Sequence, residues 1–257
     1  MHYLQGRYPV LEKKILAKNM VQYVILCPEI AAAAQPGQFV HILPVGHTLR
    51  RPISLCGIDK EKGTICIVFE LKGSGTETLA ACNVGDCMDV LGSLGHGFTL
   101  LPDAKRVVLL GGGIGNPPML PLAQYYQKRA TVISGFRSAE FVILQEAFQA
   151  AGAETILCTD NGTVGRHGLV TEPLQELLQT QQIDAVYACG PKPMLRAIAN
   201  LANTADVFCE VSLEERMGCG IGACLVCACK LERDGKPVSA HVCKDGPVFS
   251  AKEVVWE

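Results

Sequence analysis

Residues 107–118 read VVLLGGGIGNPP, an apolar run followed by a glycine-rich turn and two prolines. Four consecutive apolar residues are typical of a strand that is buried on both faces, as strands of parallel sheets are. Glycines let the backbone turn sharply, and Asn116 followed by Pro117 predicts the N-cap and the first residue of a helix. A helix N-terminus below a glycine turn favours phosphate binding, so Gly112, Gly113 and Ile114 are candidate nucleotide contacts.

The same turn also has a purely structural interpretation. Gly111 and Gly113 match the start of the dinucleotide-binding fingerprint, but Asn116 replaces its third glycine, and no acidic residue follows about twenty positions later. The alternative is a tight strand-to-helix connection without a ligand.

Strands and helices alternate through the rest of the central region. The sequence predicts strands at 130–135, 155–159 and 185–189, and helices at 117–129, 140–151, 173–180 and 192–202. Apolar strands that alternate with helices indicate a parallel α/β sheet. Because ligands collect at the carboxyl ends of such strands, the turn Cys189-Gly190-Pro191 is a second candidate contact.

The N-terminal region shows a different pattern, in which short β-type runs are separated by turn residues. The expected strands cover 21–26, 38–43, 64–70 and 88–92, with turn signals at 36–37, 59–63 and 84–86. Strands at this spacing favour a small antiparallel barrel.

Two short motifs in this region carry ligand-binding groups. Arg51-Pro52-Ile53-Ser54 leads off a strand; its guanidinium suits bidentate binding of a pyrophosphate, and Ser54 offers a hydrogen bond to a ring nitrogen. Gly73-Ser74-Gly75-Thr76 follows another strand. Taken singly, an isolated arginine is usually a solvated surface group, and Gly-Ser-Gly-Thr is usually a hairpin turn.

The C-terminal region contains four cysteines with the spacing Cys-x4-Cys-x2-Cys-x15-Cys, namely Cys219, Cys224, Cys227 and Cys243. This is the spacing of plant-type [2Fe-2S] proteins, in which four thiolates hold two irons. Glycines inside the first gap let the backbone wrap the cluster and direct N–H groups at its sulfurs.

Three alternatives to this assignment stay open. Structural zinc sites usually combine two Cys-x2-4-Cys units, whereas here the fourth cysteine stands alone. A disulfide or a set of buried thiols gives no reason for the glycines. Cys229 could replace Cys227 as the third ligand, although the spacing favours Cys227 and leaves Cys229 as a free thiol.

The composition predicts a reducing compartment. Of the thirteen cysteines, eight stand singly in apolar or strand-like sequence, so no disulfide framework is expected. The N-terminus lacks the apolar core of a signal peptide, and no stretch approaches the ~20 apolar residues of a membrane span. With 23 basic and 25 acidic residues and no basic run, nucleic-acid binding is not expected. We therefore expect a cytoplasmic protein that binds neither membranes nor nucleic acid.

Taken together and in order, the four turn motifs Arg-Pro-x-Ser, Gly-x-Gly-Thr, Gly-Gly-Gly-Ile-Gly-x-Pro-Pro and Cys-Gly-Pro-x-Pro-Met resemble the ferredoxin-NADP reductase superfamily. Residues 214–224 and 242–249, around the cysteines, extend the resemblance to the electron-transfer subunits of type B dihydroorotate dehydrogenases over essentially the full chain. The resemblance implies an antiparallel FAD-binding barrel at 1–101, an NAD-binding α/β domain at 102–208 and a small [2Fe-2S] segment at 209–257.

The resemblance also implies site residues and a partner. FAD would contact Arg51, Pro52, Ile53, Ser54, the backbone of Val68, Phe69 and Glu70, and Gly75 and Thr76. NAD would lie on the two glycine turns, and the four spaced cysteines would hold the cluster. An FMN-containing dihydroorotate dehydrogenase catalytic subunit, in a heterotetramer with two copies of each chain, would supply electrons that leave through FAD to NAD+ in pyrimidine biosynthesis. No catalytic acid or base is expected in this chain.

A few positions and two functional alternatives qualify this expectation. Position 70 is often arginine in the family, so Glu70 puts one side-chain contact to FAD in doubt. Ser93 and His96 stand where proline and asparagine are common in the family. His96 is expected to be an exposed loop residue. Arg137 could meet a 2′-phosphate, so NADP stays open beside NAD, which the resemblance favours. The alternatives are an NAD(P)H-dependent flavin and iron–sulfur reductase with another acceptor, and a non-catalytic redox-sensing module.

Overall fold

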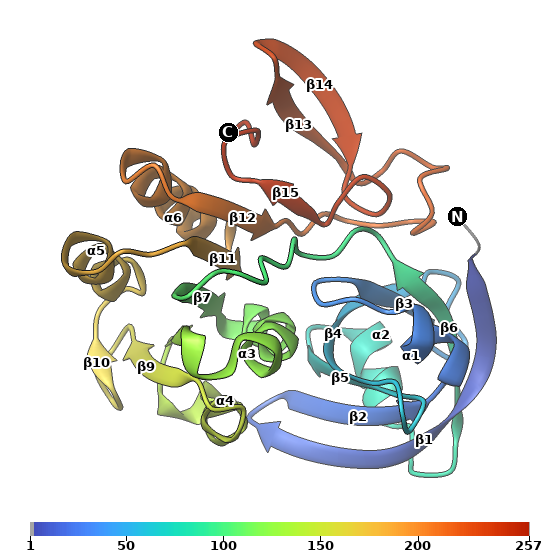
Figure 1. Ribbon diagram of the computed structural model, residues 1–257. Helices are drawn as coiled ribbons and strands as arrows, with labels where there is room; N and C mark the ends of the chain where they lie inside the picture. Colours follow the sequence, from blue (N-terminus) through green and yellow to red (C-terminus); the bar gives the residue numbers. More distant parts are fainter. Residues whose placement is uncertain (1–2, 257) are drawn as a thin grey trace.

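Six antiparallel strands close into a barrel in the order β1-β2-β5-β4-β3-β6 (Figure 1). The computed structural model describes residues 3–256 and bounds these strands as β1 Leu4–Ala17, β2 Met20–Leu26, β3 Phe39–Leu43, β4 Arg51–Asp59, β5 Thr64–Glu70 and β6 Cys87–Leu94. Closure depends on β1, which pairs with β2 along one edge and with β6 along the other. Sequence patterns did not predict β1, because Val10 is the one fully buried residue among its 14. The predicted barrel is confirmed.

Two short helices, α1 Pro28–Ala33 and α2 Ser74–Ala80, flank the barrel. Tyr23 of β2 is fully buried in the barrel core and stacks on Phe69 with ring centroids 5.9 Å apart. Its hydroxyl lies 3.0 Å from the carbonyl oxygen of Leu79 and 2.8 Å from that of Cys82, which ties the end of α2 to the barrel.

The second unit is a seven-stranded sheet in the order β10-β9-β8-β7-β11-β12-β15. Its strands are β7 Val107–Gly112, β8 Ala130–Phe136, β9 Glu154–Thr159, β10 Arg166–His167, β11 Ala185–Cys189, β12 Phe208–Ser212 and β15 Val248–Ser250. All neighbours are parallel except β15, which runs antiparallel to β12. The predicted α/β class is confirmed, with one antiparallel edge strand, a pairing that needs no crossover helix.

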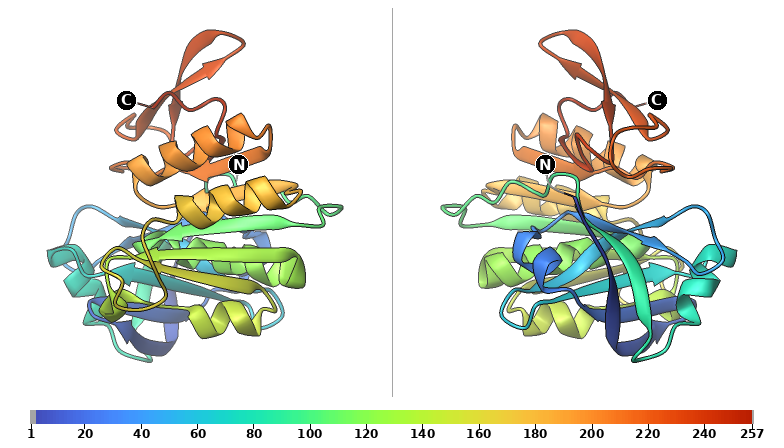
Figure 2. Two further views of the ribbon diagram at one scale, coloured as in Figure 1. Left: turned by 90° about the vertical axis from the view of Figure 1, so that its left-hand side faces the viewer. Right: turned by 90° about the vertical axis from the view of Figure 1, so that its right-hand side faces the viewer.

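Helices cover both faces of this sheet (Figure 2). Val108 and Leu110 of β7 pack in one core with α5 Thr171–Thr180 and α6 Lys192–Thr204, whereas Leu109 packs in another with α3 Leu120–Tyr126 and α4 Gln145–Ala150. This alternation explains the fully apolar run, since successive side chains of a strand point to opposite faces.

Two of the predicted helices are broken. The helix expected at 117–129 is a 3-10 turn at Pro117–Met119, then α3, then a second 3-10 turn at Gln127–Arg129, because three prolines remove hydrogen-bond donors from its start. The helix expected at 140–151 is a 3-10 turn at Ala139–Phe141 followed by α4, with Leu144 in the left-handed conformation between them. A 3-10 turn at Gly113–Gly115 precedes these elements.

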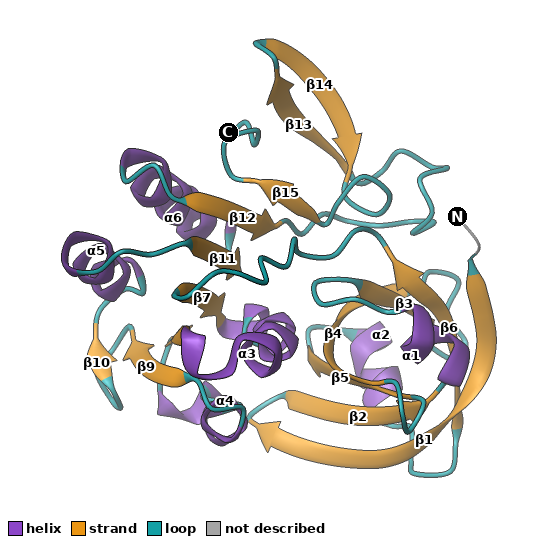
Figure 3. Cartoon of the chain, viewed as in Figure 1, coloured by secondary structure: helices purple, strands orange, loops and turns teal. Residues whose placement is uncertain are grey.

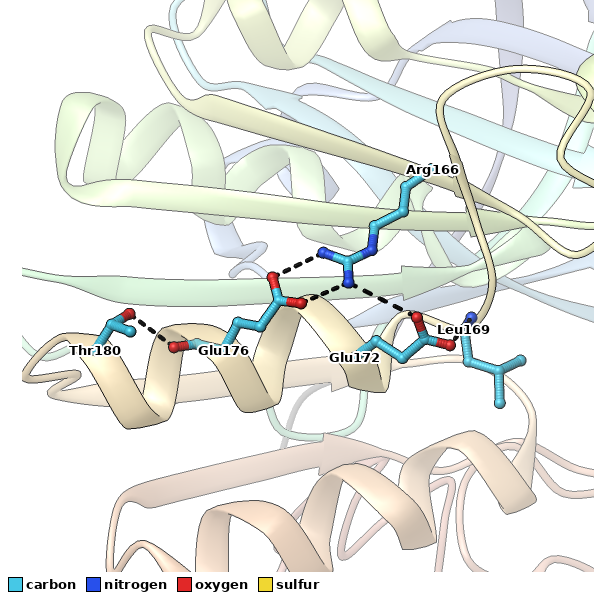
Figure 4. A network of polar contacts seen from close by, with 5 residues as sticks. All are labelled: Arg166, Leu169, Glu172, Glu176 and Thr180. Carbon is cyan, nitrogen blue, oxygen red and sulfur yellow. Dashed lines mark hydrogen bonds and ion pairs between the residues drawn. The ribbon is translucent and has the colours of Figure 1, made fainter.

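The two-residue edge strand β10 is held by an ion-pair network on α5 (Figure 4). Both terminal nitrogens of Arg166 donate to the Glu176 carboxylate, at 2.7 and 2.5 Å, and Glu172 lies 3.7 Å away. A bidentate pair fixes geometry as well as adding energy.

After β12 the chain forms a long loop, a hairpin of β13 Ala228–Arg233 and β14 Lys236–His241, and then β15 (Figure 3). The domain boundary expected at 208/209 lies within β12, and β15 from the expected cluster segment joins the seven-stranded sheet. The C-terminal segment therefore shares the core of α6, to which Leu231 and Val242 contribute.

A partly buried polar network fixes the connection between barrel and sheet. Glu210 of β12 accepts hydrogen bonds from the backbone N–H of Thr99 at 2.8 Å and from its hydroxyl at 2.7 Å. The Tyr187 hydroxyl donates to the Thr99 carbonyl at 2.7 Å. Barrel residues such as Val68 also share a core with Leu109 of the sheet, so the two units are packed together. None of the helices described for residues 3–256 has the length and apolar character that crossing a membrane requires.

Candidate functional site

The four cysteines with cluster spacing come together as two pairs around the loop that follows β12. The Cys219 N–H donates to the Cys224 sulfur at 3.3 Å, and the Cys224 N–H donates to the Cys219 sulfur at 3.3 Å. The Cys243 N–H donates to the Cys227 sulfur at 3.4 Å. Two pairs of thiols fit a cluster with two irons, each of which takes two thiolates.

Further backbone N–H groups of this loop point at the sulfurs. Ile221 and Ala223 donate to the Cys219 sulfur at 3.4 and 3.2 Å, and Gly222 donates to the Cys243 sulfur at 3.1 Å. Burial opposes ionisation of Cys219, but these N–H groups outweigh it and lower the pKa of the thiol to about 6. Thiolate is the form that binds metal, so this sulfur is prepared for ligation.

The second pair lies in a different environment. Cys227 and Cys243 are both 2% exposed, and burial together with the neighbouring Cys227 raises the pKa of Cys243 to about 12. Such thiols ionise when bound metal supplies the compensating charge. Cys229 lies on β13 opposite Ala240, and burial raises its pKa to about 11.

Within residues 3–256, no three or more His, Cys, Asp or Glu side chains converge on the position of a single metal ion. A structural zinc site requires four ligands around one ion. The hydrogen bonds above join the thiols as the pairs Cys219–Cys224 and Cys227–Cys243, an arrangement that fits a two-iron cluster.

In the barrel, the structure brings Arg51 and Gly75 together from β4 and α2. A Cβ at Gly75 would collide with the Arg51 guanidinium, which donates to the Leu49 carbonyl at 2.8 Å. The Thr76 hydroxyl accepts the Lys72 N–H at 2.9 Å and donates to the Gly73 carbonyl at 2.9 Å, so it shapes the turn beside the guanidinium.

Strands β4 and β5, which carry the predicted FAD contacts 51–54 and 68–70, are not paired with each other along these residues. The ladder between β4 and β5 ends at Leu55 and Ile67. Beyond it, Arg51–Ser54 pairs with β3 and Val68–Glu70 pairs with β2. The side chains of Val68 and Phe69 are buried, so this edge of β5 presents backbone groups, which suits hydrogen bonding to a planar ring.

Two of the three residues that depart from the family pattern, Glu70 and His96, have defined surroundings. The Glu70 carboxylate forms an ion pair with Lys72 at 3.0 Å, so it is directed to its own loop. His96 is exposed, as expected, and its backbone N–H donates to the Gly246 carbonyl at 2.6 Å.

The two glycine turns of the sheet lie on one edge and pack against each other. Cys189 pairs with Gly111, and the residues that follow are in contact: a Cβ at Gly112 would lie 2.6 Å from the Met194 sulfur and 2.9 Å from Pro191. A Cβ at Gly115 would collide with the Cys189 carbonyl. Candidate contacts 112–114 and 189–191 therefore form one surface, on which Gly113 (φ +53°) has open space around it.

Asn116 occupies the predicted N-cap position, with Pro117 as the first residue of the 3-10 turn, but its side chain does not cap the turn. Asn116 is fully buried and makes no capping bond; its amide nitrogen donates backward to the Gly113 carbonyl at 3.0 Å. The side chain occupies the space beside Gly111, where a Cβ would collide with it. The Asn116 side chain thus shapes the glycine turn, while its backbone carbonyl accepts the Met119 N–H at 3.0 Å at the start of the 3-10 turn.

One surface cavity of about 570 Å³ lies where the barrel, the seven-stranded sheet domain and the C-terminal segment meet. It is lined by Leu49, Arg50, Arg51 and Pro52 of the barrel, Lys192 at the start of α6, and Glu214, Glu215, Arg216 and Met217, which lead into the cluster loop. Lys192 and Glu215 form an ion pair across it. A second cavity, of about 440 Å³, lies at the amino end of the sheet near Arg106 and Lys128, away from the predicted site residues.

Sequence patterns did not single out His41, which lies between the barrel motif and the cluster loop. It is fully buried on β3 opposite Pro52, and Gly220 packs on its ring. Burial and the adjacent Arg50 lower the pKa of His41 to about 4. The sequence signal that could have identified His41 is a histidine within an otherwise apolar barrel strand.

Comparison with known proteins places this geometry in a family. The family model for the iron-sulfur cluster binding domain of dihydroorotate dehydrogenase B matches residues 214–255. The dihydroorotate dehydrogenase B (NAD(+)) electron transfer subunit of Bacillus caldolyticus is 42% identical over 97% of this chain and 98% of its own length. The corresponding protein of Caldanaerobacter subterraneus subsp. tengcongensis is 43% identical over 86% of this chain and 87% of its own length.

Solved structures agree on the architecture. A structure of NADH-dependent reduced ferredoxin-NADP oxidoreductase, described in a study of flavin-based electron bifurcation, aligns with a TM-score of 0.86 and 27% identity, covering 98% of this chain and 90% of the other. The Amycolatopsis cytochrome P450 reductase shares the fold over 79% of this chain and 66% of its own, with a TM-score of 0.67 and 20% identity. The chain belongs to the family of dihydroorotate dehydrogenase B (NAD(+)) electron transfer subunits.

Proposed function

We propose that this chain passes electrons from the FMN of a dihydroorotate dehydrogenase catalytic subunit, through a [2Fe-2S] cluster and FAD, to NAD+. The observation that carries the proposal is the cavity at the junction of the three parts. The Arg51 motif, the start of α6 and the segment before the cluster loop all line it, so a flavin held there lies between cluster and nicotinamide sites. Flavin and cluster, when bound, supply the redox chemistry, since a flavin exchanges hydride with nicotinamide and single electrons with a cluster.

The chain's own residues hold and orient these groups. Arg51 would bind the FAD pyrophosphate, with Gly75 leaving room for it and Thr76 shaping the turn. Pro52, Ile53 and Ser54 would contact the flavin from β4, and the backbone of Val68, Phe69 and Glu70 from β5. These assignments are supported by the separation of β4 from β5, which exposes both strands to one ligand.

Cys219, Cys224, Cys227 and Cys243 would hold the cluster. Their arrangement in two pairs and the N–H groups directed at their sulfurs support this assignment over one that includes Cys229. NAD would lie on Gly112, Gly113, Ile114, Cys189, Gly190 and Pro191, where two packed turns leave open space at Gly113. The proposed functional parts are the FAD-binding barrel at 1–101, the NAD-binding domain at 102–208 and the cluster-binding segment at 209–257. Strands β12 and β15 join the last two parts.

The partner is an FMN-containing catalytic subunit, in an assembly of two copies of each chain. Support comes from the names of the relatives, which are subunits, and from the exposed end of the cluster loop. Cys224, Leu225 and Val226 are exposed, so electrons can enter at the Cys219 and Cys224 side. The proposed location is the cytoplasm, because none of the thirteen cysteines, all of which lie among the described residues, forms a disulfide, and such chains require a reducing compartment.

The test is reconstitution with the candidate catalytic subunit. The complex, purified anaerobically, should reduce NAD+ when dihydroorotate is added, and much more slowly with NADP+. The matched control is the same complex with Cys224→Ser, which should lose this activity while keeping FAD. If the complete complex oxidises NADH with a dye but shows no dihydroorotate-driven reduction of NAD+, the physiological donor or acceptor is a different one and the proposal is wrong.

A further inference from the structure

His41 occupies the junction between the proposed flavin strands and the cluster loop. It lies on β3 with no exposed surface, and its partner in the ladder is Pro52 of the proposed FAD motif. Arg50 pins this part of the strand, since its guanidinium donates to the His41 carbonyl at 3.0 Å and to the Asp89 carboxylate at 2.8 Å. The backbone of His41 is therefore held by the barrel.

The ring is in direct contact with the cluster loop. Gly220, between two of the proposed ligands, has φ +74°, and a Cβ there would lie 2.5 Å from the His41 Nδ1. The ring faces the backbone of Cys219 and Arg50, yet neither of its nitrogens reaches a partner at hydrogen-bonding geometry among the described residues. A polar group that is fully buried without a partner is unfavourable, so an apolar side chain would suit this position better unless the histidine gains a partner.

We propose that His41 is a positioning residue for the cluster: when the cluster is bound, a ring N–H donates to the Cys219 backbone carbonyl and ties the cluster loop to the flavin strands. The inference rests on the proposed function, since it assumes a cluster on Cys219 and FAD beside Pro52. Only a small shift is needed, because the ring already faces the Cys219 backbone and contacts Gly220. His41 then sets where the cluster lies relative to the flavin.

Other contacts to the same loop provide a matched control. The Tyr3 hydroxyl donates to the Ile221 carbonyl at 3.2 Å, and Tyr3 is 36% exposed. Tyr3→Phe removes one hydrogen bond to the loop without touching the barrel motif. An effect specific to His41 must exceed that of Tyr3→Phe.

The experiment compares His41→Leu, His41→Asn and Tyr3→Phe in the full chain with its cofactors. His41→Leu fills the site without a donor, whereas His41→Asn keeps an N–H near the position of Nδ1. For each protein we would measure FAD content, the EPR spectrum of the dithionite-reduced cluster and the rate of iron loss to a chelator. His41→Leu should keep its FAD, show shifted g values and lose iron about tenfold faster, the order expected for one lost hydrogen bond. His41→Asn should restore the wild-type spectrum, and Tyr3→Phe should change the rate less than twofold.

Each other outcome has a definite meaning. An unchanged spectrum and iron-loss rate in His41→Leu would overturn the inference, as would an Asn variant that behaves like the Leu variant, because the N–H would then have no role. If His41→Leu does not fold, His41→Met supplies a flexible apolar replacement for the same comparison. A wild-type protein that shows no [2Fe-2S] signal would overturn the proposed function itself, which distinguishes the two failures.

Discussion

The glycine-rich turn after β7 and the glycine-containing cluster loop differ in what surrounds them. In the turn, Gly111, Gly112 and Gly115 are buried, and a methyl group on any of them would collide with protein atoms. In the cluster loop, residues 223–226 are exposed, and the backbone N–H groups point at cysteine sulfurs.

This difference separates two reasons for glycine. In the turn after β7, an added side chain would meet Asn116 at Gly111, Met194 and Pro191 at Gly112, or the Cys189 carbonyl at Gly115, so packing of the chain itself forms this turn. In the cluster loop, Gly220 and Gly222 have φ of +74° and +80°, which turns N–H groups toward the sulfurs. The cluster loop should therefore depend on its cofactor far more than the nucleotide turn does.

The largest expected effect breaks the cluster loop. Cys224→Ser should damage or abolish the cluster, because a serine hydroxyl ionises far less readily than a thiol and is a poorer iron ligand, whereas Cys229→Ser should leave it largely intact. Iron, sulfide and visible spectra of anaerobically purified protein measure this. The Cys224→Ser protein should still bind FAD and reduce a dye with NADH. Bleaching by Cys229→Ser alone would show that the third ligand is misassigned.

The next effect tests whether the nucleotide turn is formed by packing. Gly115→Ala should lower the free energy of unfolding by about 3 kcal/mol, since the added methyl group meets the Cys189 carbonyl and backbone cannot move aside. Urea unfolding of the purified protein measures it. The control is Gly73→Ala, where nothing lies within 4 Å of an added Cβ. Equal effects in the two variants would remove the packing argument.

A smaller effect concerns the ligand between the two loops. Arg51→Ala should weaken FAD binding by about ten- to a hundredfold, because a charged pyrophosphate loses a hydrogen bond worth about 1.5–3 kcal/mol. Titration of the apoprotein with FAD, followed by flavin fluorescence, measures the affinity. Lys62→Ala, an exposed cation of the same barrel that pairs with Asp59, should leave it unchanged. Unaltered FAD affinity in Arg51→Ala would place the pyrophosphate elsewhere.

The smallest effect sits at the opposite end of β7. The Asp184 carboxylate accepts the N–H groups of Arg106 at 2.9 Å and Lys105 at 2.6 Å, and these bonds hold its pKa below the usual value. A lowered folded-state pKa means that the stabilisation is present above the unfolded pKa, near 4, and is lost as the pH falls through the folded value.

Asp184→Asn should therefore cost less than ~1 kcal/mol at pH 7, because the carboxylate is partly solvated. The difference from wild type should shrink below pH ~4. Urea unfolding at pH 7, 5 and 3.5 measures it. A difference that grows on acidification would have the wrong sign for this mechanism.

Much of this protein was predictable from short-range patterns. The apolar run before Gly111 identified a sheet strand, and the cysteine spacing identified the cluster loop, because each signal is contained within a few neighbouring residues. The exposed strand β1 and the short strands β12 and β15 gave weak signals, since their places depend on pairing with distant segments. Patterns also predicted two unbroken helices where prolines and Leu144 interrupt them.

The sequence by itself determined the two folded units, the cluster spacing and the family resemblance. Only the tertiary structure decided that β15 returns to the nucleotide sheet, that Arg51 lies against Gly75, and that His41 lies beneath Gly220. The physical reason is the range of the interactions. Propensity, turn chemistry and thiol spacing act between near neighbours and are recorded locally, whereas barrel closure and the meeting of three segments at one cavity require contacts between residues far apart in the chain.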